Sequence, residues 1–327
     1  MLLIVRLISA MKTIHTKLDR LKRSPAEILP LVFIVLLGIF LRFYKLDWGE
    51  GYFFHPDEYH ISIAVDRLHF PVQLNPKLFS YGSFSVYLIY FSKLLFALKS
   101  NTFLVGRFFS ALLSSFTIII SYLIAKEIFK NSFALLSTFL IAITPGLVQQ
   151  AHFATPESTL IFWLMFTLYF WLTYIRKSKL KLLIISGITL GLAIGTKIVA
   201  ALLIPTLVLV VFLPNLVARK KSISKLSKLL KCLLSTPKFS LAFLVAAITF
   251  FLVFPFSVLD FPGFRNSMQY ESSVASGTPV VFYTRQFIDT KPFVFQAQKI
   301  FPYALSPALL IFGTIGLFVL IIYLVRK

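Results

Sequence analysis

Long apolar runs alternate with short polar or basic segments along this chain. Eight of the runs approach the roughly 20 residues that a helix needs to cross a bilayer. Because open sheets leave backbone groups unsatisfied in lipid, the pattern predicts an all-α polytopic membrane protein. We expect its spans at about residues 28–44, 103–125, 132–149, 158–175, 182–195, 198–215, 240–258 and 303–324.

The segment 82–98, GSFSVYLIYFSKLLFAL, is ambiguous because it is short, carries Lys93 and is rich in Ser and Tyr. Loop charge decides its placement, since Lys and Arg gather in cytoplasmic loops. If 82–98 lies in the membrane interface, 21 of the 33 Lys and Arg residues fall on one side, with only three of the twelve acids. If it crossed, both large basic loops would move outside. We therefore interpret it as a juxtamembrane helix.

This topology divides one transmembrane domain, residues 1–327, into loops of two kinds. The cytoplasmic side holds a basic leader (1–27) and a basic loop (216–239). The external side holds a first loop (45–102) with interfacial helices at 57–69 and 82–98, two short turns near 151–158 and 195–198, and a loop at 259–302. The first apolar run has no small-residue cleavage site after it and predicts an uncleaved anchor. We expect an integral protein of a prokaryotic plasma membrane with a cytoplasmic N-terminus.

Composition agrees with this class. The chain is 58% hydrophobic, with a mean hydropathy of +0.85 and a net charge of +21. In a soluble protein that charge would suggest nucleic acid, but here it follows the topology, so we expect membrane lipids and no nucleic acid as partners. The single Cys232 excludes a disulfide within the chain.

The densest group of ionisable residues lies in GYFFHPDEYH, residues 51–60. Pro56 suits the first turn of a helix, and acids there complement the helix dipole. That reading explains one acid well, but it does not explain why two histidines and two acids crowd into six residues. A half-buried carboxylate among aromatic residues is also typical of a general base. Asp57 and Glu58 are therefore candidate catalytic residues.

Two further charges stand alone at span ends. Glu157 follows Thr155 and Pro156, so it fits an ordinary helix start, but the topology places it on the same face as Asp57. Lys197 sits in GLAIGTKIVAALLIP with no acid nearby in sequence. It is either a lysine that snorkels from a helix end or an ammonium that binds a lipid-borne phosphate. Arg107 and Lys77 are weaker candidates for the same role.

His55, His60 and His152 raise the question of a metal. The chain has no HExxH and no clustered Cys/His pattern, so dispersed histidines indicate structural or hydrogen-bonding roles. We consider His60 and His152 as substrate contacts and His55 as the weak candidate for a metal ligand. A divalent ion held by Asp57, Glu157 and a histidine stays open, and no cofactor is predicted firmly.

Four stretches, in order over about residues 40–205, resemble the GT-C glycosyltransferases. The resemblance is to the group of dolichyl-phosphate-mannose protein mannosyltransferases and lipid A aminoarabinose transferases. The stretches are LRFYKLDWGEGYFFHPDEYH, VGRFFSALLSSFTIIISYLIAKEIF, TPGLVQQAHFATPESTLIFWLMFTLYF and GITLGLAIGTKIVAALLIP.

The resemblance implies a GT-C-type helical bundle that transfers a sugar, with inversion, from a polyprenyl-phosphate donor to a protein, glycan or lipid acceptor on the external side. Carried over by position, Asp57 is the general base with Glu58 beside it, Glu157 is the second-loop acid and Lys197 the phosphate ligand. Three departures from the family pattern matter. The second-loop acid is Glu rather than Asp, residues 70–81 lack a Glu-Lys-Pro element of aminoarabinose transferases, and many relatives continue beyond eight spans.

Two other classes fit the composition. A transporter or flippase should show inverted repeats and charges near the midplane, whereas here the charges collect at the external ends. A non-catalytic scaffold is the third alternative. The transferase hypothesis requires that Asp57, Glu157 and Lys197 line one outward-facing cavity at the lipid boundary.

Overall fold

The computed structural model describes residues 25–98, 101–216 and 236–326. Apart from one isolated bridge between His69 and Gln73, the regular structure of these residues is helical. The predicted leader and most of the predicted loop 216–239 lie outside the described residues. The helices are α2 (Pro25–Phe43), α3 (Pro56–Asp66), α4 (Phe84–Leu95), α5 (Thr102–Ile128), α6 (Asn131–Ala142), α7 (Pro145–Ala151), α8 (Glu157–Lys177), α9 (Leu180–Thr196), η1 (Ile198–Leu203), α10 (Ile204–Leu216), α12 (Thr236–Val253), α13 (Phe256–Leu259), α14 (Phe261–Ala275), η2 (Arg285–Phe287), η3 (Gln296–Ile300), α15 (Phe301–Leu305) and α16 (Pro307–Arg326).

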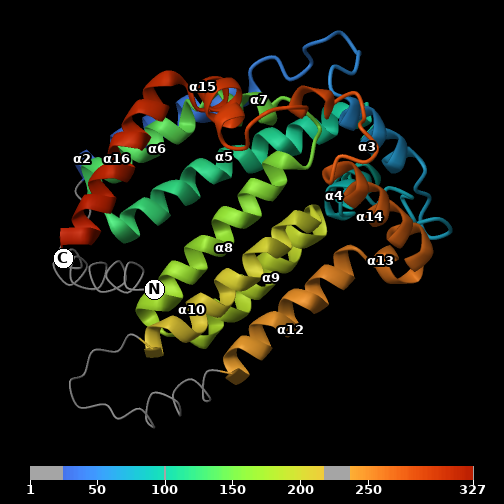
Figure 1. Ribbon diagram of the computed structural model, residues 1–327. Coiled ribbons are helices and arrows are strands. Elements are labelled where there is room, and N and C mark those ends of the chain that lie inside the picture. Colours follow the sequence, from blue (N-terminus) through green and yellow to red (C-terminus); the bar gives the residue numbers. More distant parts are fainter. Residues whose placement is uncertain (1–24, 99–100, 217–235, 327) are drawn as a thin grey trace.

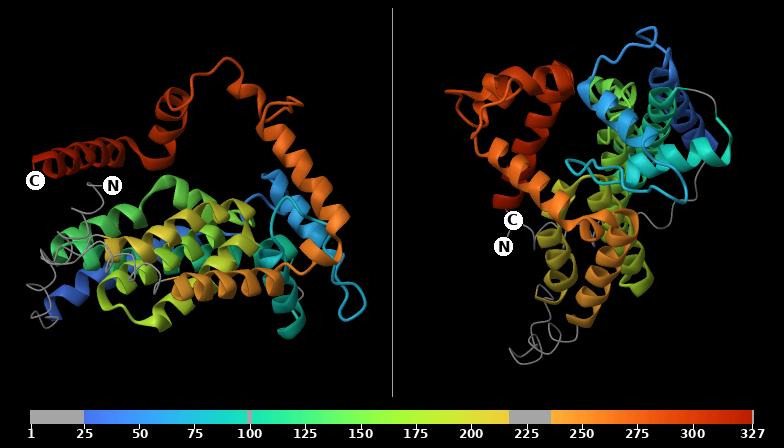
Figure 2. Two further views of the ribbon diagram at one scale, coloured as in Figure 1. Left: turned by 60° about the horizontal axis from the view of Figure 1, so that its bottom comes forward. Right: turned by 90° about the vertical axis from the view of Figure 1, so that its right-hand side faces the viewer.

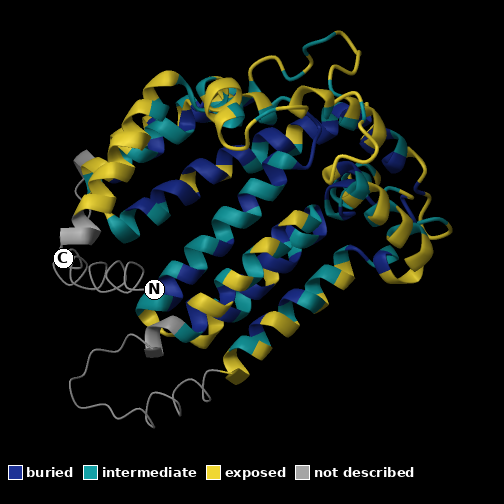
Figure 3. Ribbon diagram, in the orientation of Figure 1, coloured by how far each residue is buried: buried dark blue, intermediate teal, exposed yellow. Residues whose placement is uncertain are grey.

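The long helices form a row in which each packs against the next, in the order α6, α5, α8, α9 and α12. α2 lies against α5 and α6, and α10 lies near α8 and α12. The segment from α14 to α16 arches over one side of this row (Figure 2). Burial follows the arrangement: α5 is buried along much of its length, whereas α12 and α16 are largely exposed (Figure 3). The predicted all-α fold is thus confirmed.

The two ends of the row differ in what they carry. α3, α4 and α14 gather at one end, which we call the site end, where α5 and α8 begin and α9 and α12 finish (Figure 1). At the opposite end an ion pair between Arg176 and Glu127 joins α8 to α5. Lys126, Lys177 and Lys179 also lie near this end, where α5 and α8 finish and α9 begins. These charged residues therefore lie at the end of the bundle opposite the site end.

Each predicted span coincides with a helix or a bent helix pair. Among the described residues, three helices (α5, α8 and α12) are long and apolar enough to cross a membrane, or up to five spans if each bent pair counts as one. Shorter apolar helices occupy 28–43, 180–196 and 198–212, where further spans were predicted. The count of eight stays a prediction.

Two predicted spans are not straight. The span 132–149 is bent by 53° between α6 and α7, and the span 303–324 is bent by 113° between α15 and α16. Proline begins the second helix of each pair, Pro145 in α7 and Pro307 in α16, and its missing N–H and ring prevent a continuous helix. Each of these two predicted spans is therefore a bent pair of helices.

Arg42 of α2 satisfies the backbone that the first bend exposes. Its Nη1 donates to the carbonyl oxygen of Ala142 at 2.8 Å, and its Nε donates to Ser114 Oγ at 2.8 Å. The guanidinium is fully buried. Because the last carbonyls of a helix have no partner within it, a buried arginine at this point stabilises the break. Sequence analysis did not single out Arg42.

A glycine face on α9 sets the distance to α12. Gly187, Gly191 and Gly195 recur every four residues, and a Cβ at Gly187 or Gly191 would overlap a carbonyl oxygen of α12. Small residues at this spacing let two helix backbones approach closely in a membrane. This face ends next to Lys197, so the same packing positions the end of α9 for the site.

Candidate active site

Glu58 and Arg107 form a fully buried ion pair at the site end. Arg107 Nε donates to Glu58 Oε1 at 2.8 Å, and Nη2 donates to Oε2 at 2.9 Å. Both side chains are 0% exposed. The two-bond geometry is the strongest form of an arginine–carboxylate contact. Sequence analysis placed Glu58 beside the base and Arg107 among the phosphate ligands, but this arrangement leaves neither group open to a substrate, and we correct both assignments.

The pair connects three segments that are distant in sequence. Arg107 Nη1 donates to the carbonyl oxygens of Leu46, at 3.1 Å, and Trp48, at 2.8 Å, and Glu58 Oε1 accepts from Ala154 N at 2.8 Å. The guanidinium also lies over the Trp48 ring, 5.1 Å from its centroid. We call Glu58, Arg107 and these partners the loop clamp, since it fixes the loop between α2 and α3 to α5 and to the turn before α8.

Asp57 points elsewhere, although it is the neighbour of Glu58. Pro56 starts α3, and His55 caps it by accepting from Asp57 N at 3.2 Å. Asp57 keeps partial exposure, at 24% of its side chain, and lies close to the Tyr81 hydroxyl. Burial raises the pKa of Tyr81, and the nearby negative charge of Asp57 raises it further, so the hydroxyl stays protonated.

Glu157 and Lys197 meet across the junction of α8 and α9. Lys197 Nζ lies 2.9 Å from Glu157 Oε1, although the two residues are 40 positions apart. Lys197 sits in extended backbone between α9 and η1, where the helix breaks. Its side chain is 31% exposed. The predicted lone cation therefore has a partner, and the ammonium still has donors that face outward.

Tyr81 brings the two halves of the site together. Its ring lies under Lys197 Nζ, 5.3 Å from the ring centroid, while its hydroxyl lies close to Asp57. The negative charges of Glu157 and of Glu271, which lies on α14, also raise the pKa of this hydroxyl. Tyr81 is thus close to Asp57 and to the pair of Glu157 and Lys197, while the outward-facing cavity that the hypothesis requires stays a prediction. Sequence analysis missed Tyr81, because a tyrosine in a loop carries no periodic signal.

The position of Tyr81 depends on Gly82. Gly82 N donates to the carbonyl oxygen of Thr196 at 3.0 Å, and a Cβ at this position would overlap the carbonyl of Gly195. The loop before α4 therefore touches the end of α9 backbone to backbone. That contact places Tyr81 next to Lys197, the residue that follows α9.

We expect Gly82→Ala to destabilise this contact by roughly 1–3 kcal/mol, the usual cost of overpacking. Thermal unfolding in detergent should detect the loss. Gly313→Ala is the matched control, since its Cβ would meet open space. Equal unfolding temperatures for both variants would contradict the tight contact.

The histidines divide into different roles. The ring nitrogens of His152 lie 2.8 Å from the carbonyl oxygen of Val148 and 3.0 Å from that of Tyr44. His152 therefore links α7 to the end of α2 and is not placed as a substrate contact. His60 is exposed and packs edge-on against Tyr59. Within the described part of the chain no group of three His, Cys, Asp or Glu residues could hold a metal ion. His55 Nδ1 lies 3.7 Å from Asp57 Oδ2, and this pair does not make a metal site.

Lys77 also has a structural partner. Its Nζ lies 2.6 Å from Asp260 Oδ2, which accepts from Asn75 Nδ2 at 2.8 Å. Hydrogen bonds from Lys77 and Asn75 lower the pKa of Asp260. Since Asp260 also caps α14, the three residues hold the loop between α3 and α4 against the start of that helix. The phosphate role considered for Lys77 finds no support in this geometry.

Comparison with known proteins identifies the class. The chain has the fold of the S. cerevisiae protein O-mannosyltransferase Pmt1-Pmt2 complex bound to the sugar donor, with a TM-score of 0.60 and 18% identity over 75% of this chain and 35% of that one. An Archaeoglobus fulgidus oligosaccharyltransferase tethered with an acceptor peptide matches at a TM-score of 0.50 and 18% identity, over 91% of this chain and 38% of that one. The fold is thus that of GT-C membrane glycosyltransferases.

The family follows from sequence. The model of the family described as dolichyl-phosphate-mannose-protein mannosyltransferase matches residues 84–270, more than half of the chain. The chain therefore belongs to this family.

Two curated relatives match over shorter regions. The undecaprenyl phosphate-alpha-4-amino-4-deoxy-L-arabinose arabinosyl transferase of Wigglesworthia glossinidia brevipalpis is 28% identical over 62% of this chain and 36% of its own length. An uncharacterized protein of Aquifex aeolicus is 36% identical over 30% of this chain and 20% of its own. The matched regions thus span about a third or less of these relatives.

Proposed function

We propose that this protein transfers a sugar from a polyprenyl-phosphate donor to an acceptor hydroxyl at the external face of a prokaryotic plasma membrane, with inversion at the anomeric carbon. The observation that carries this proposal is the meeting of Asp57, Glu157 and Lys197 around Tyr81. Family membership and the GT-C fold support it. The acceptor is a hydroxyl of a protein, glycan or lipid.

The chemistry assigns a separate task to each charge. Asp57 takes the proton of the acceptor hydroxyl, and a lone pair of the acceptor oxygen forms a bond to the anomeric carbon. The bond from that carbon to the phosphate oxygen breaks, and its electron pair leaves with the phosphate. Lys197 stabilises the negative charge that develops on the phosphate oxygen. Glu157 holds the ammonium at 2.9 Å and so keeps it beside the reacting bond.

The site needs no separate acid, because a phosphate is already a stable leaving group. Its charges lie at the site end of the bundle, where α8 begins and α9 finishes, which suits a donor whose phosphate lies at the membrane surface. Tyr81 is a positioning residue that lies close to the Asp57 carboxylate and supports Lys197 with its ring.

The test is transfer of a radiolabelled sugar from polyprenyl phosphate by the purified protein in liposomes. We expect Lys197→Met to lower turnover by about 10²–10³-fold, the usual effect of removing one group that stabilises developing charge. Lys291→Met, which removes an exposed lysine beyond α14, is the matched control and should retain activity. Full turnover in Lys197→Met, or movement of the intact lipid without sugar transfer, would refute the proposal.

A further inference from the structure

A polar cavity lies beside the C-terminal half of α3, whereas Asp57 lies in the first turn of that helix. It has a volume of about 410 Å³ and is lined by Gly51, Phe53, Ser62, Asp66, Lys93, Asn101, Thr102 and Phe103. Five of these eight residues are polar. α3 provides Ser62 and Asp66, α4 provides Lys93, and the start of α5 provides Thr102 and Phe103. The cavity is therefore built by three helices and the loop that precedes α3.

The polar groups of the cavity offer both donors and acceptors. Thr102 Oγ1 lies 2.7 Å from Asp66 Oδ1 and accepts from Lys93 Nζ, and the Asp66 carboxylate is 63% exposed. Ser62 is 94% buried as a residue and lines the cavity, yet its Oγ has no hydrogen-bond partner among the described residues. Asn101 makes no side-chain cap to α5, so its amide is also available.

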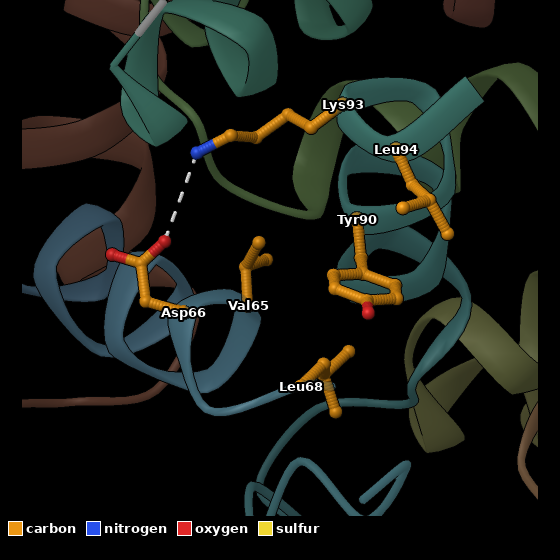
Figure 4. Close-up of a pocket in the computed structure, with 6 residues that line it drawn as sticks. All are labelled: Val65, Asp66, Leu68, Tyr90, Lys93 and Leu94. Atoms are coloured by element: carbon orange, nitrogen blue, oxygen red, sulfur yellow. Dashed lines mark ion pairs between the residues drawn. The ribbon is translucent and has the colours of Figure 1, made fainter. Parts of the chain in front are cut away.

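A smaller, more apolar cavity adjoins this one. It has a volume of about 290 Å³ and shares Asp66 and Lys93, which pair at 3.8 Å. Figure 4 shows Lys93 reaching from α4 toward Asp66 on α3, with Val65, Leu68, Tyr90 and Leu94 beside them. The ion pair thus holds α3 to α4 and forms one wall of the polar cavity.

The charges of the polar cavity exclude several kinds of ligand. One carboxylate and one ammonium give a neutral lining, and the carboxylate disfavours a phosphate or another anion. A single carboxylate next to an ammonium does not suit a divalent cation. Hydroxyl, amide and charged groups near the partly exposed ring of Phe53 do suit an uncharged ligand whose many hydroxyls both donate and accept.

We propose that this cavity binds an uncharged sugar unit of the acceptor, at a distance from the hydroxyl that reacts. The proposal rests on the proposed function and specifies its acceptor as a glycan. Asp57 is in the first turn of α3 and Asp66 is its last residue, so the helix rise separates them by about 13 Å. That distance is too long for the reacting sugar to fill both places, but an oligosaccharide chain can span it.

The test measures binding separately from transfer. Purified full-length protein in lipid nanodiscs is applied to an array that carries uncharged oligosaccharides, sulfated oligosaccharides and peptides. We expect binding to uncharged oligosaccharides, weakened about tenfold by Asp66→Asn, which removes one charge-assisted hydrogen bond. Asn101→Ala, which truncates an exposed side chain, should weaken it several-fold while leaving the unfolding temperature unchanged. Asp57→Asn should abolish sugar transfer and retain glycan binding.

Each other result has a definite meaning. Binding confined to sulfated oligosaccharides or peptides, no glycan binding at all, or equal binding by wild type, Asp66→Asn and Asn101→Ala would overturn the acceptor site. Glycan binding that Asp66→Asn and Asn101→Ala weaken, in a wild-type protein that transfers no sugar, would instead refute the proposed function and leave the cavity as a glycan site.

Discussion

Asp57→Asn is expected to lose about 10²–10⁴-fold of sugar transfer, the usual contribution of a positioned general base. An amide keeps the shape of the side chain, but it cannot take a proton from the acceptor. The fold should survive, because Asp57 is partly exposed and stands outside the loop clamp. Initial rates with a radiolabelled polyprenyl-phosphate sugar measure the loss.

The matched control is Asp47→Asn. Asp47 is an exposed acid of the same external loop, so its amide should leave transfer near the wild-type rate. Donor binding separates a chemical effect from a binding effect, and we expect it to be retained in Asp57→Asn. Wild-type turnover in that variant would remove Asp57 as the base, and equal losses in both variants would indicate a general effect of loop charge.

The second large effect concerns folding and not chemistry. Glu58→Ala leaves the Arg107 guanidinium buried without its carboxylate, and breaking a buried pair in this way costs roughly 3–5 kcal/mol. Arg107→Met should cost a similar amount, because the carbonyls of Leu46 and Trp48 also lose their donor. Thermal unfolding and yield of monodisperse protein measure both losses.

A double variant tests the pairing itself. Glu58→Leu combined with Arg107→Met removes both charges, so it should recover part of the stability that either single change loses. Arg67→Met, at the exposed C-cap of α3, is the control and should unfold like the wild type. If the two single losses simply add in the double variant, Glu58 and Arg107 do not act as a pair.

The long apolar runs predicted the helical fold well, because the length of each run is visible in one continuous stretch of sequence. The break at Lys197 and the polar turn before Glu157 were also visible, since glycine, proline and charge interrupt the runs there. The bends after Ala142 and Leu305 had a local signal in Pro145 and Pro307, but the runs were long enough to conceal them.

Pairing across the sequence could not be read in the same way. Lys197 and Glu157 stand 40 positions apart, and Arg107 and Glu58 stand 49 apart, so no local pattern connects the partners. Arg107 resembled an outward cation only because it begins a span. Tyr81 had one weak signal, the glycine beside it, and its role depends on a contact with α9 that only the folded chain creates.

The loop clamp has a consequence for biosynthesis. Glu58 and Arg107 are both synthesised before residue 130, yet Glu58 also accepts a hydrogen bond from the backbone of Ala154, which is made later. The loop that carries Asp57 therefore completes its hydrogen bonds only after the turn between α7 and α8 has been synthesised, immediately before Glu157.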